Sequence, residues 1–282
     1  MTKPLYPWVG GKTRVLDYIN ANTPSMFGDY HEPFLGGGAV AIQMMEKYPK
    51  KTFHLSDFNS ELVLAWQAVK NSPHEVIELL KEHFDRHEKT YFLSVRGWDK
   101  RGLLPFKTDA ERGARFIYIC VSSFRSVWSE NDAGHCTSSF GFEVARNYDF
   151  GNLLEVSALL NSRNTVITHR SYEEGLPQVE ASDFVYLDPP YATDDDEGTA
   201  TFDEYLKGGA GEGFQEKLRV YLDTLSEKGV AVLASNANTA TTRALYDGWG
   251  TAKKKIVYGL ALNQGAPKDE MLFANPTLFH ML

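Results

Sequence analysis

Short apolar segments alternate with segments of helical periodicity along most of this chain, and this alternation restricts its fold more than any other feature. Each apolar segment ends near a polar residue or a glycine, as buried parallel strands do. The pattern therefore predicts an α/β fold, with a mostly parallel sheet covered by helices on both faces. The expected strands are His31–Phe34, Thr52–Ser56, Thr165–Thr168, Phe184–Leu187 and Val230–Ala234, and the expected helices are Thr13–Asn20, Ala39–Lys47, Glu61–Lys70, Phe214–Ser226 and Thr241–Tyr246.

The stretch from Ser72 to Phe150 interrupts this alternation and is interpreted as an insert. It lacks a strand pattern, and its second half is rich in Gly, Ser, Asn and Asp, which indicates irregular loop. Helices are expected at Pro73–His83, Lys89–Trp98 and Ala110–Phe124, an irregular loop at Asn131–Asn147, and two strands joined by a turn at Asn263–Gly265 within Lys253–Phe273. We predict one domain formed by residues 1–71 and 151–282, and a helical insert formed by residues 72–150.

Composition excludes several classes of protein. Hydrophobic residues make up 43% and charged residues 23% of the 282 residues, which is ordinary for a globular domain. No apolar window is long enough to span a membrane, and the N-terminus lacks the apolar core of a signal peptide. Two cysteines and scattered histidines show no metal-binding spacing, so no metal is expected. The net charge of −8 argues mildly against a nucleic-acid partner, but basic residues on one face would outweigh it.

A run of glycines follows the first expected strand. Gly36, Gly37 and Gly38 let the backbone turn tightly and approach a ligand beside a helix N-terminus, although a turn without a ligand has the same pattern. Asp57 ends the next strand about twenty residues later, where an acid binds the two hydroxyls of a ribose in nucleotide-binding folds. A second interpretation is that Asp57 caps the helix that begins near Asn59.

The residues around this loop favour a particular class of nucleotide ligand. The loop lacks the Gly-x-x-x-x-Gly-Lys-Ser/Thr pattern of a P-loop, and Glu32 just before it would repel a pyrophosphate. A cationic or zwitterionic adenosine compound fits better than a dinucleotide. S-adenosylmethionine is such a compound, because it joins adenosine to a sulfonium and an amino-acid group.

The tetrapeptide Asp188-Pro189-Pro190-Tyr191 follows a fully apolar expected strand. The strand would deliver Asp188 to the carboxyl edge of the sheet, where open α/β folds bind ligands. The prolines fix a rigid exit whose carbonyl oxygens still accept hydrogen bonds. A carboxylate and a carbonyl placed on the hydrogens of an exocyclic base amine would return electron density to its nitrogen. Tyr191 would stack on that base, and the nitrogen would be oriented toward a methyl group.

In this order, the motifs resemble the Dam-type (D12 class) family of DNA adenine-N6 methyltransferases. PLYPWVGGKTRVLDYI looks like the family's opening Trp-x-Gly-Gly-Lys segment, and HEPFLGGGAV looks like its Glu-Pro-Phe-x-Gly-x-Gly loop. SDFN, DPPY, TFDEY, LASNAN and DEMLFAN follow at fitting intervals, so the resemblance covers nearly the whole chain. It implies a Rossmann-like class I S-adenosylmethionine-dependent methyltransferase fold, with a helical target-recognition domain at residues 72–150.

The resemblance also implies a role for each matching residue. Asp188, Pro189 and Tyr191 would act on the target base. The residues implied for the S-adenosylmethionine site are Trp8, Gly10, Gly11, Lys12, Glu32, Phe34, Gly36, Gly38, Asp57, Phe58, Tyr172 and Asp188. The residues implied for DNA binding are Arg115, Arg125, Ser126, Trp128, Ser129, Asn131, Phe202 and Tyr205. S-adenosylhomocysteine would be the product, and no metal would take part.

Four departures from the family pattern stand out. Ser171 precedes Tyr172 where the family often has Asp before an aromatic residue, and Pro7 replaces a Lys before the opening Trp. Ser129 stands where an Arg that reads guanine is common, so GATC specificity is not assumed. The acidic run at residues 194–197 lies in a loop expected to face DNA. We hypothesise that this loop is mobile without substrate and folds away from the site or over it on binding; the alternative is a solvated surface loop.

Alternatives to adenine methylation stay open from the residues alone. Cytosine C5 methylation needs a cysteine nucleophile, and neither Cys120 nor Cys136 follows a proline at a strand end. Cytosine N4 methylation, a catalytically silent DNA- or cofactor-binding homologue, and an RNA or protein amine methyltransferase remain possible. The expected partner is double-stranded DNA, with no membrane. We expect a monomer or weak dimer in the cytoplasm of a bacterial or phage-infected cell, and any companion restriction nuclease on a separate chain.

Overall fold

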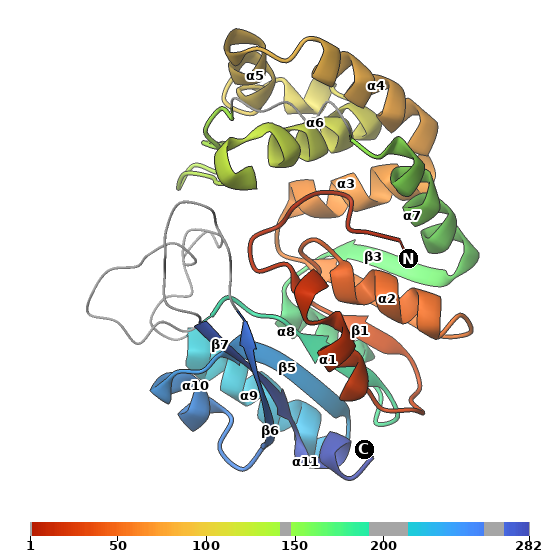
Figure 1. The fold of residues 1–282 in the computed structure, drawn as a ribbon, viewed down its shortest axis with the longest axis vertical. Helices are drawn as coiled ribbons and strands as arrows, with labels where there is room; N and C mark the ends of the chain where they lie inside the picture. The colour runs from red at the N-terminus through yellow and green to blue at the C-terminus, as the bar shows by residue number, and fades with distance from the viewer. Residues whose placement is uncertain (1, 142–147, 192–213, 257–267, 282) are drawn as a thin grey trace.

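The computed structural model describes residues 2–141, 148–191, 214–256 and 268–281, and a seven-stranded sheet lies at its centre (Figure 1). The strand order is β3-β2-β1-β4-β5-β7-β6; β1 to β5 run parallel, and β7 runs antiparallel to β5 and β6. The strands are β1 (Tyr30–Glu32), β2 (Thr52–Asp57), β3 (Asn164–His169), β4 (Phe184–Leu187), β5 (Ala231–Ala237), β6 (Gly250–Ile256) and β7 (Lys268–Ala274). The predicted α/β fold with a mostly parallel sheet is confirmed.

Two hydrophobic clusters cover the two faces of the sheet. In β4, Phe184 and Tyr186 belong to one cluster, whereas Val185 and Leu187 belong to the other. This follows from the two-residue period of a strand, which points successive side chains to opposite faces. All four residues are buried, which explains why the central strand is a continuous apolar run rather than an alternating one.

Helices from both parts of the chain pack on these faces. The first cluster includes residues of α1 (Leu16–Ala21), α2 (Ala39–Lys47), α3 (Ser60–Asn71) and α7 (Phe150–Ser162). The second includes residues of α8 (Tyr172–Gly175), α9 (Phe214–Glu227) and α10 (Ala240–Leu245). The short α11 (Pro276–Phe279) packs on β5 and β7.

The insert lies at one end of the molecule, where α4, α5 and α6 are grouped above α3 (Figure 1). It contains α4 (Pro73–Asp85), α5 (Lys89–Arg96), the 3-10 turn η2 (Leu104–Phe106), α6 (Asp109–Ser122) and the 3-10 turn η3 (Phe124–Ser126). Phe116 and Tyr118 of α6 belong to the same cluster as Trp66 of α3. The insert therefore shares its core with the sheet, and the domain boundaries at residues 72 and 150 stay a prediction.

The structure corrects several expected elements. The predicted helix at Thr13–Asn20 is divided into a 3-10 turn, η1 (Lys12–Arg14), and α1. Strand β1 ends at Glu32 because Pro33 has no N–H to donate to a neighbouring strand. Helix α7 was not predicted, although Asp149 caps it by accepting a hydrogen bond from Asn152 N at 2.9 Å. The two C-terminal strands are confirmed as β6 and β7, but the expected turn at Asn263–Gly265 lies outside the described residues.

The strand order reverses direction between β1 and β4, which is where open α/β sheets commonly bind ligands. After β1 the chain continues to β2 on one side, whereas β4 lies on the other side of β1. At such a point the two connections leave in opposite directions, and a crevice forms beyond the carboxyl ends of the strands. The glycine loop follows β1 and Asp188 follows β4, so both motifs lie at this position.

Candidate active site

The glycines after β1 are required by both their backbone angles and their neighbours. Gly36 has φ +48° and Gly38, the N-cap of α2, has φ +67°, in the left-handed region that only glycine enters at little cost. A Cβ on Gly36 would lie 2.8 Å from Cδ1 of Trp8, and one on Gly38 would lie 2.5 Å from Cζ2 of Trp66. The loop is therefore closely packed between two indole rings.

The N-terminal segment lies against the glycine loop and holds its backbone. Gly36 O accepts hydrogen bonds from the Tyr6 hydroxyl at 3.2 Å and from Trp66 Nε1 at 3.3 Å. The Trp8 ring lies 5.8 Å from that of Tyr6 and 6.0 Å from that of Phe116 in α6. Trp8 thus connects the predicted cofactor loop with the insert.

Asp57, at the end of β2, holds the same loop from the other side. Its carboxylate accepts hydrogen bonds from Gly36 N at 2.9 Å and Asn59 N at 3.0 Å. Burial raises the pKa of Asp57, and these two N–H groups oppose the rise. Asn59, not Asp57, caps α3, because its side chain accepts a hydrogen bond from Leu62 N. The capping interpretation of Asp57 is therefore wrong, and Asp57 instead shapes the glycine loop.

Lys12 joins the N-terminal segment to the end of β4. Its Nζ lies 2.7 Å from Oδ2 of Asp188, donates to Gly10 O at 2.6 Å, and lies 5.1 Å from the centre of the Tyr191 ring. The Lys12 side chain is only 3% exposed, whereas that of Asp188 is 21% exposed. Lys12, Asp188 and Tyr191, predicted separately from the sequence, are thus brought together at the sheet edge.

Glu32, the last residue of β1, adds a second carboxyl group to this site. It is buried and accepts a hydrogen bond from the Tyr30 hydroxyl at 2.5 Å. Burial raises the pKa of Glu32 from 4.5 to about 8; the hydrogen bond from Tyr30 opposes the rise, the charge of Asp188 adds to it, and that of Lys12 opposes it. Glu32 is therefore mostly protonated at neutral pH, first because burial disfavours its charged form and second because ionisation would add a negative charge beside Asp188 and Asp57.

Aromatic side chains lie along the same edge. The Phe34 and Tyr172 rings stack with centroids 5.4 Å apart, and Phe58, directly after β2, is 49% exposed. Ser171, which replaces the family's Asp, caps α8: its hydroxyl accepts from Glu174 N at 3.3 Å, and its N–H donates to the Glu174 carboxylate at 2.7 Å. Ser171 is thus the N-cap of α8. Phe58 is the aromatic residue of this group whose ring is accessible.

Three residues near this site, two in β5 and one at the end of α10, were assigned no role from the sequence. β5 pairs with β4, with Leu187 beside Ala234, so the next residues of β5, Ser235 and Asn236, lie near Asp188. Both are fully buried. The charge of Asp188 is one cause, after burial, of the raised pKa of the Tyr246 hydroxyl, which places that ring near the carboxylate. The LASNAN motif was the available signal for this group.

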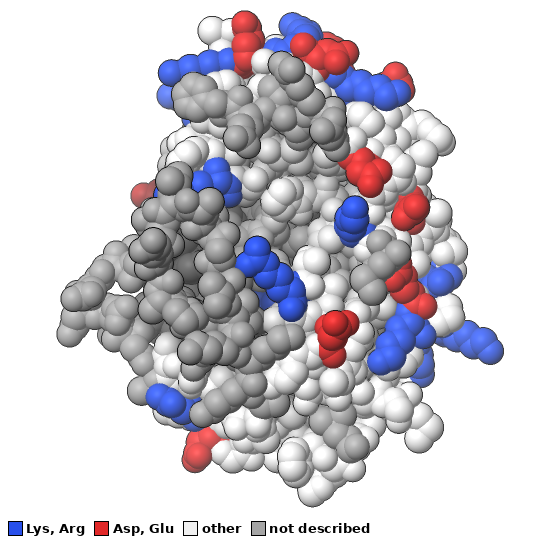
Figure 2. Space-filling view, in the orientation of Figure 1, with Lys and Arg blue, Asp and Glu red and all other residues white. Residues whose placement is uncertain are grey.

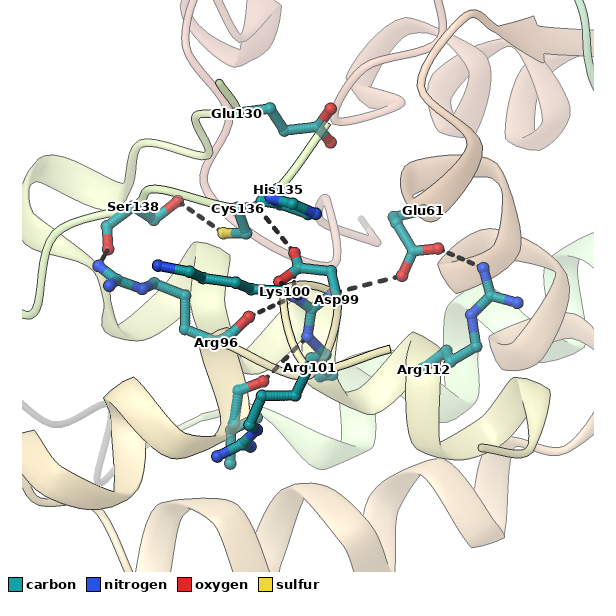
Figure 3. Close-up of polar contacts among 12 residues, drawn as sticks. Glu61, Arg96, Asp99, Lys100, Arg101, Arg112, Glu130, His135, Cys136 and Ser138 are labelled. Carbon is teal, nitrogen blue, oxygen red and sulfur yellow. Dashed lines mark hydrogen bonds and ion pairs between the residues drawn. The ribbon is translucent and has the colours of Figure 1, made fainter. Parts of the chain in front are cut away.

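Arg115 does not have the exposure that a DNA contact needs. Its guanidinium is fully buried in the insert and donates to Val95 O at 3.0 Å, Arg96 O at 2.6 Å and the Asp99 carboxylate at 2.8 Å. It also lies 3.4 Å from Glu61 of α3. Figure 3 shows the side chains of Glu61, from α3, and of Asp99, from the segment after α5. A structural role replaces the prediction that Arg115 contacts DNA.

Trp128 requires the same correction. It is 2% exposed, packs 4.5 Å from the Phe116 ring, and donates from Nε1 to Glu130 at 3.0 Å. Its ring lies 5.7 Å from the guanidinium of Arg115. Trp128 is therefore part of the core that supports the loop after α6, and it is not accessible to a DNA duplex.

The segment after α6 carries four further predicted DNA contacts, which are Arg125, Ser126, Ser129 and Asn131. Arg125 is exposed, and its guanidinium lies 5.2 Å from the centre of the Phe124 ring. The backbones of Arg125 (φ +58°) and Ser126 (φ +56°) are in the left-handed region. The side chain of Asn131 is exposed and accepts hydrogen bonds from Ala133 N at 3.1 Å and His135 N at 3.0 Å. Ser129 is half-buried. Phe202, Tyr205 and the acidic residues 194–197 lie outside the described residues.

Charges on the insert are mixed rather than uniformly basic. Figure 2 shows Lys and Arg next to Asp and Glu over the end of the molecule that holds α4 and α5. Three basic residues of the insert form ion pairs with acids three or four residues away: Lys81 with Glu78, Arg86 with Glu82, and Lys107 with Glu111. Within the described ranges, no group of His, Cys, Asp and Glu could hold a metal ion, and no helix is long and apolar enough to cross a membrane.

Comparison with known proteins identifies the family. The family model described as D12 class N6 adenine-specific DNA methyltransferase matches residues 8–259. The type II methyltransferase M1.LlaDCHI of Lactococcus lactis subsp. cremoris is 30% identical over 86% of this chain and 84% of its own. The type II methyltransferase M.MjaIII of Methanocaldococcus jannaschii is 30% identical over 93% of each chain. A DNA adenine methylase of Vibrio cholerae is 30% identical over 86% of this chain and 83% of its own.

These matches decide between the alternatives left open by the residues. The family and the DNA adenine methylase support adenine N6 as the target, and nothing in them favours cytosine N4 or a silent homologue. The geometry agrees, because the glycine loop, Lys12 and Asp188 meet at the position where the strand order reverses. This chain belongs to the D12 class of N6 adenine-specific DNA methyltransferases.

Proposed function

We propose that this methyltransferase takes its methyl group from S-adenosylmethionine and transfers it to the N6 amine of an adenine turned out of a DNA duplex. The observation that carries this proposal is the ion pair between Lys12 and Asp188 at 2.7 Å. It joins the Gly10-Gly11-Lys12 segment, predicted to lie over the cofactor, to the acid predicted to hold the target. The ion pair therefore holds the two proposed binding segments beside each other.

The chemistry of the pocket suits S-adenosylmethionine. Glu32, Asp57 and Asp188 surround the end of β1 with carboxyl groups, which favour a cationic ligand. Each oxygen of a carboxylate has two lone pairs, so Asp57 can keep its bonds to Gly36 and Asn59 and still accept ribose hydroxyls. The exposed ring of Phe58 is placed to flank the adenine. When bound, the cofactor supplies a methyl group activated by a positively charged sulfur.

The end of β4 would orient the target amine. The Asp188 carboxylate and the Pro189 carbonyl are the acceptors for its two hydrogens, and Tyr191 is the ring that stacks on the base. Lys12 holds Asp188 and lies near the Tyr191 ring, so it fixes both groups relative to each other. The amine nitrogen must lose one proton as it gains the methyl group. Asp188 is the nearest proposed acceptor, and preorganised groups of this kind need no rearrangement during the reaction.

The insert would read the DNA through its exposed loop. Arg125, Ser126, Ser129 and Asn131 remain proposed contacts, as do Phe202 and Tyr205, which lie outside the described residues. Ser129 cannot pair with O6 and N7 of guanine as an arginine does, so the recognition sequence is proposed to differ from GATC. We further propose a cytoplasmic monomer or weak dimer, with any companion nuclease on another chain.

The test is transfer of labelled methyl from S-adenosylmethionine to mixed-sequence duplex DNA, followed by digestion to nucleosides. Label in N6-methyladenine is expected. Asp188→Asn keeps the size of the side chain but removes its charge, and we expect transfer to fall by roughly a hundredfold or more. Asp223→Asn, an exposed change in α9, should leave transfer unchanged.

Two outcomes would overturn the proposal. Transfer by Asp188→Asn within a few-fold of the unchanged enzyme would reject the role of the carboxylate. Failure of the unchanged enzyme to transfer label from S-adenosylmethionine, while the family's target base is present, would reject the donor.

A further inference from the structure

The loop that follows α6 forms a short hairpin whose returning strand is held by the insert. Glu130 and Cys136 form an antiparallel bridge, and Thr137 N donates to Ser129 O at 2.8 Å. Ser129 N donates to the Ser138 hydroxyl at 3.0 Å. We call residues 129–138 the recognition hairpin, because it carries the proposed DNA contacts Ser129 and Asn131. Its position on the insert therefore decides where those side chains meet DNA.

Asp99 binds the backbone of this hairpin with its carboxylate. Its Oδ2 accepts hydrogen bonds from Cys136 N at 2.7 Å and from Arg115 Nη2 at 2.8 Å, and its Oδ1 accepts from Lys100 N at 2.6 Å. Figure 3 shows Asp99 directed toward the Cys136 segment. The Asp99 side chain is 8% exposed. A buried carboxylate with three N–H donors is a strong and directional anchor.

Arg115 in turn holds Asp99 in place relative to the rest of the protein. It is anchored by the carbonyl oxygens of Val95 and Arg96 at the end of α5 and lies 3.4 Å from Glu61. Glu61 belongs to the first turn of α3, four residues after Asp57 at the end of β2. The charges of Arg115, Asp99 and Glu61 are all buried, so removing one leaves the others poorly compensated.

A second contact ties the same strand of the hairpin to α5. Arg96 Nη1 donates to Ser138 O at 2.9 Å (Figure 3). Arg96 is half-buried, in contrast to Arg115. Two adjacent points of the returning strand, Cys136 N and Ser138 O, are thus bound by residues from one short stretch of the insert.

We propose that Asp99, supported by Arg115, is a positioning residue for target recognition, which sets the place of the recognition hairpin without touching DNA itself. The inference rests on the proposed DNA-reading role of this hairpin. Asp99→Asn keeps the shape of the side chain but leaves only one oxygen that can accept hydrogen bonds. The new NH₂ group would face other donors, either Lys100 N or the pair formed by Arg115 Nη2 and Cys136 N. The hairpin is then held less firmly. DNA discrimination falls, whereas the cofactor pocket, built from other segments, is unaffected.

The experiment compares Asp99→Asn with Asp85→Asn, the same chemical change at an exposed position at the end of α4. The sequence methylated by the unchanged enzyme is first mapped by sequencing of methylated DNA. The kcat/KM is then measured on a duplex with that site and on duplexes with one base pair changed. Discrimination is the kcat/KM on the correct site divided by the kcat/KM on a changed duplex. We expect this ratio to fall about tenfold in Asp99→Asn, mainly because KM for the correct site rises. The ratio should stay the same in Asp85→Asn.

Two further measurements separate positioning from general loss of structure. The Cys136 amide should exchange with deuterium about tenfold faster in Asp99→Asn, whereas the affinity for S-adenosylmethionine should be unchanged. Arg96→Gln, which removes the second tie at a less buried residue, should lower discrimination in the same direction. Unchanged discrimination and unchanged Cys136 protection would overturn the proposal. So would equal losses of discrimination and cofactor affinity in both variants.

The failure of this inference is distinguishable from failure of the proposed function. If the unchanged enzyme does not methylate DNA, the proposed function is rejected, and deuterium exchange still reports whether Asp99 holds the hairpin. If the unchanged enzyme methylates a defined sequence and the Asp99→Asn variant reads that sequence equally well, only the positioning role is rejected.

Discussion

The protonation of Glu32 predicts an unusual dependence of stability on pH. Its pKa is about 8 in the folded protein, against 4.5 for the ordinary group. Because folding raises this pKa, protonation of Glu32 contributes to the stability of the folded protein. This contribution is fully present below about pH 4.5 and is lost as the pH rises through about 8. Between about pH 5.5 and pH 8.5, this single group should lower the free energy of unfolding by about 3 kcal/mol. Glu32 is only 2% exposed, so solvent screens this effect little.

Replacement of Glu32 by Gln isolates this contribution. Gln has the same size, keeps an oxygen that can accept the hydrogen bond from Tyr30, and does not ionise. The free energy of unfolding is measured by denaturant titration of both proteins at the two pH values. The difference between variant and unchanged protein should shift by about 3 kcal/mol in favour of the variant as the pH rises. Glu155→Gln, an exposed change in α7, should show no comparable shift.

The result that would refute this reasoning is equally specific. If the Glu32→Gln variant and the unchanged protein keep the same difference in unfolding free energy at both pH values, Glu32 is ionised throughout. Burial and the neighbouring charge of Asp188 would then not suffice to protonate it, and the prediction that cofactor binding releases a proton from Glu32 would lose its basis.

The remaining predictions concern the same pocket. Binding of S-adenosylmethionine near pH 7 should release up to one proton, because the cation lowers the pKa of Glu32, and binding of S-adenosylhomocysteine should release less. Calorimetry in buffers of different ionisation enthalpy measures the number of protons released. Equal proton release by the Glu32→Gln variant would contradict this prediction. Gly36→Ala should destabilise the fold by about 2 kcal/mol or more and weaken cofactor binding, because its Cβ would lie 2.8 Å from Trp8. Gly102 has φ +66°, but a Cβ placed on it would have no atom within 4 Å. Gly102→Ala should therefore lower the free energy of unfolding, measured by denaturant titration, by only about 1 kcal/mol. Equal losses at both positions would show that the Trp8 side chain moves aside.

Elements with a strong local signal were predictable from the sequence. Strand β4 and helix α2 have the bounds that were expected from the sequence. An apolar segment between turn-forming residues is compatible with few structures other than a buried strand or helix. Helix α7 had an available signal that was missed: Leu153, Val156 and Leu160 recur at helical spacing after the capping residue Asp149. The split between η1 and α1 was not readable, because nothing local at Val15 breaks the helical pattern.

The sequence by itself determined the chemistry at the carboxyl edge of the sheet: a glycine loop, an acid after each of two strands, and a rigid Asp-Pro-Pro-Tyr exit. Each depends on residues adjacent in the chain, so their spacing was sufficient. Only the tertiary structure decided what long-range partners do. It buried Arg115 between Asp99 and Glu61, which are 16 and 54 residues away, and so changed a predicted DNA contact into a structural support. It also raised the pKa of Glu32, because desolvation and the charge of Asp188 depend on groups that meet only in the folded chain.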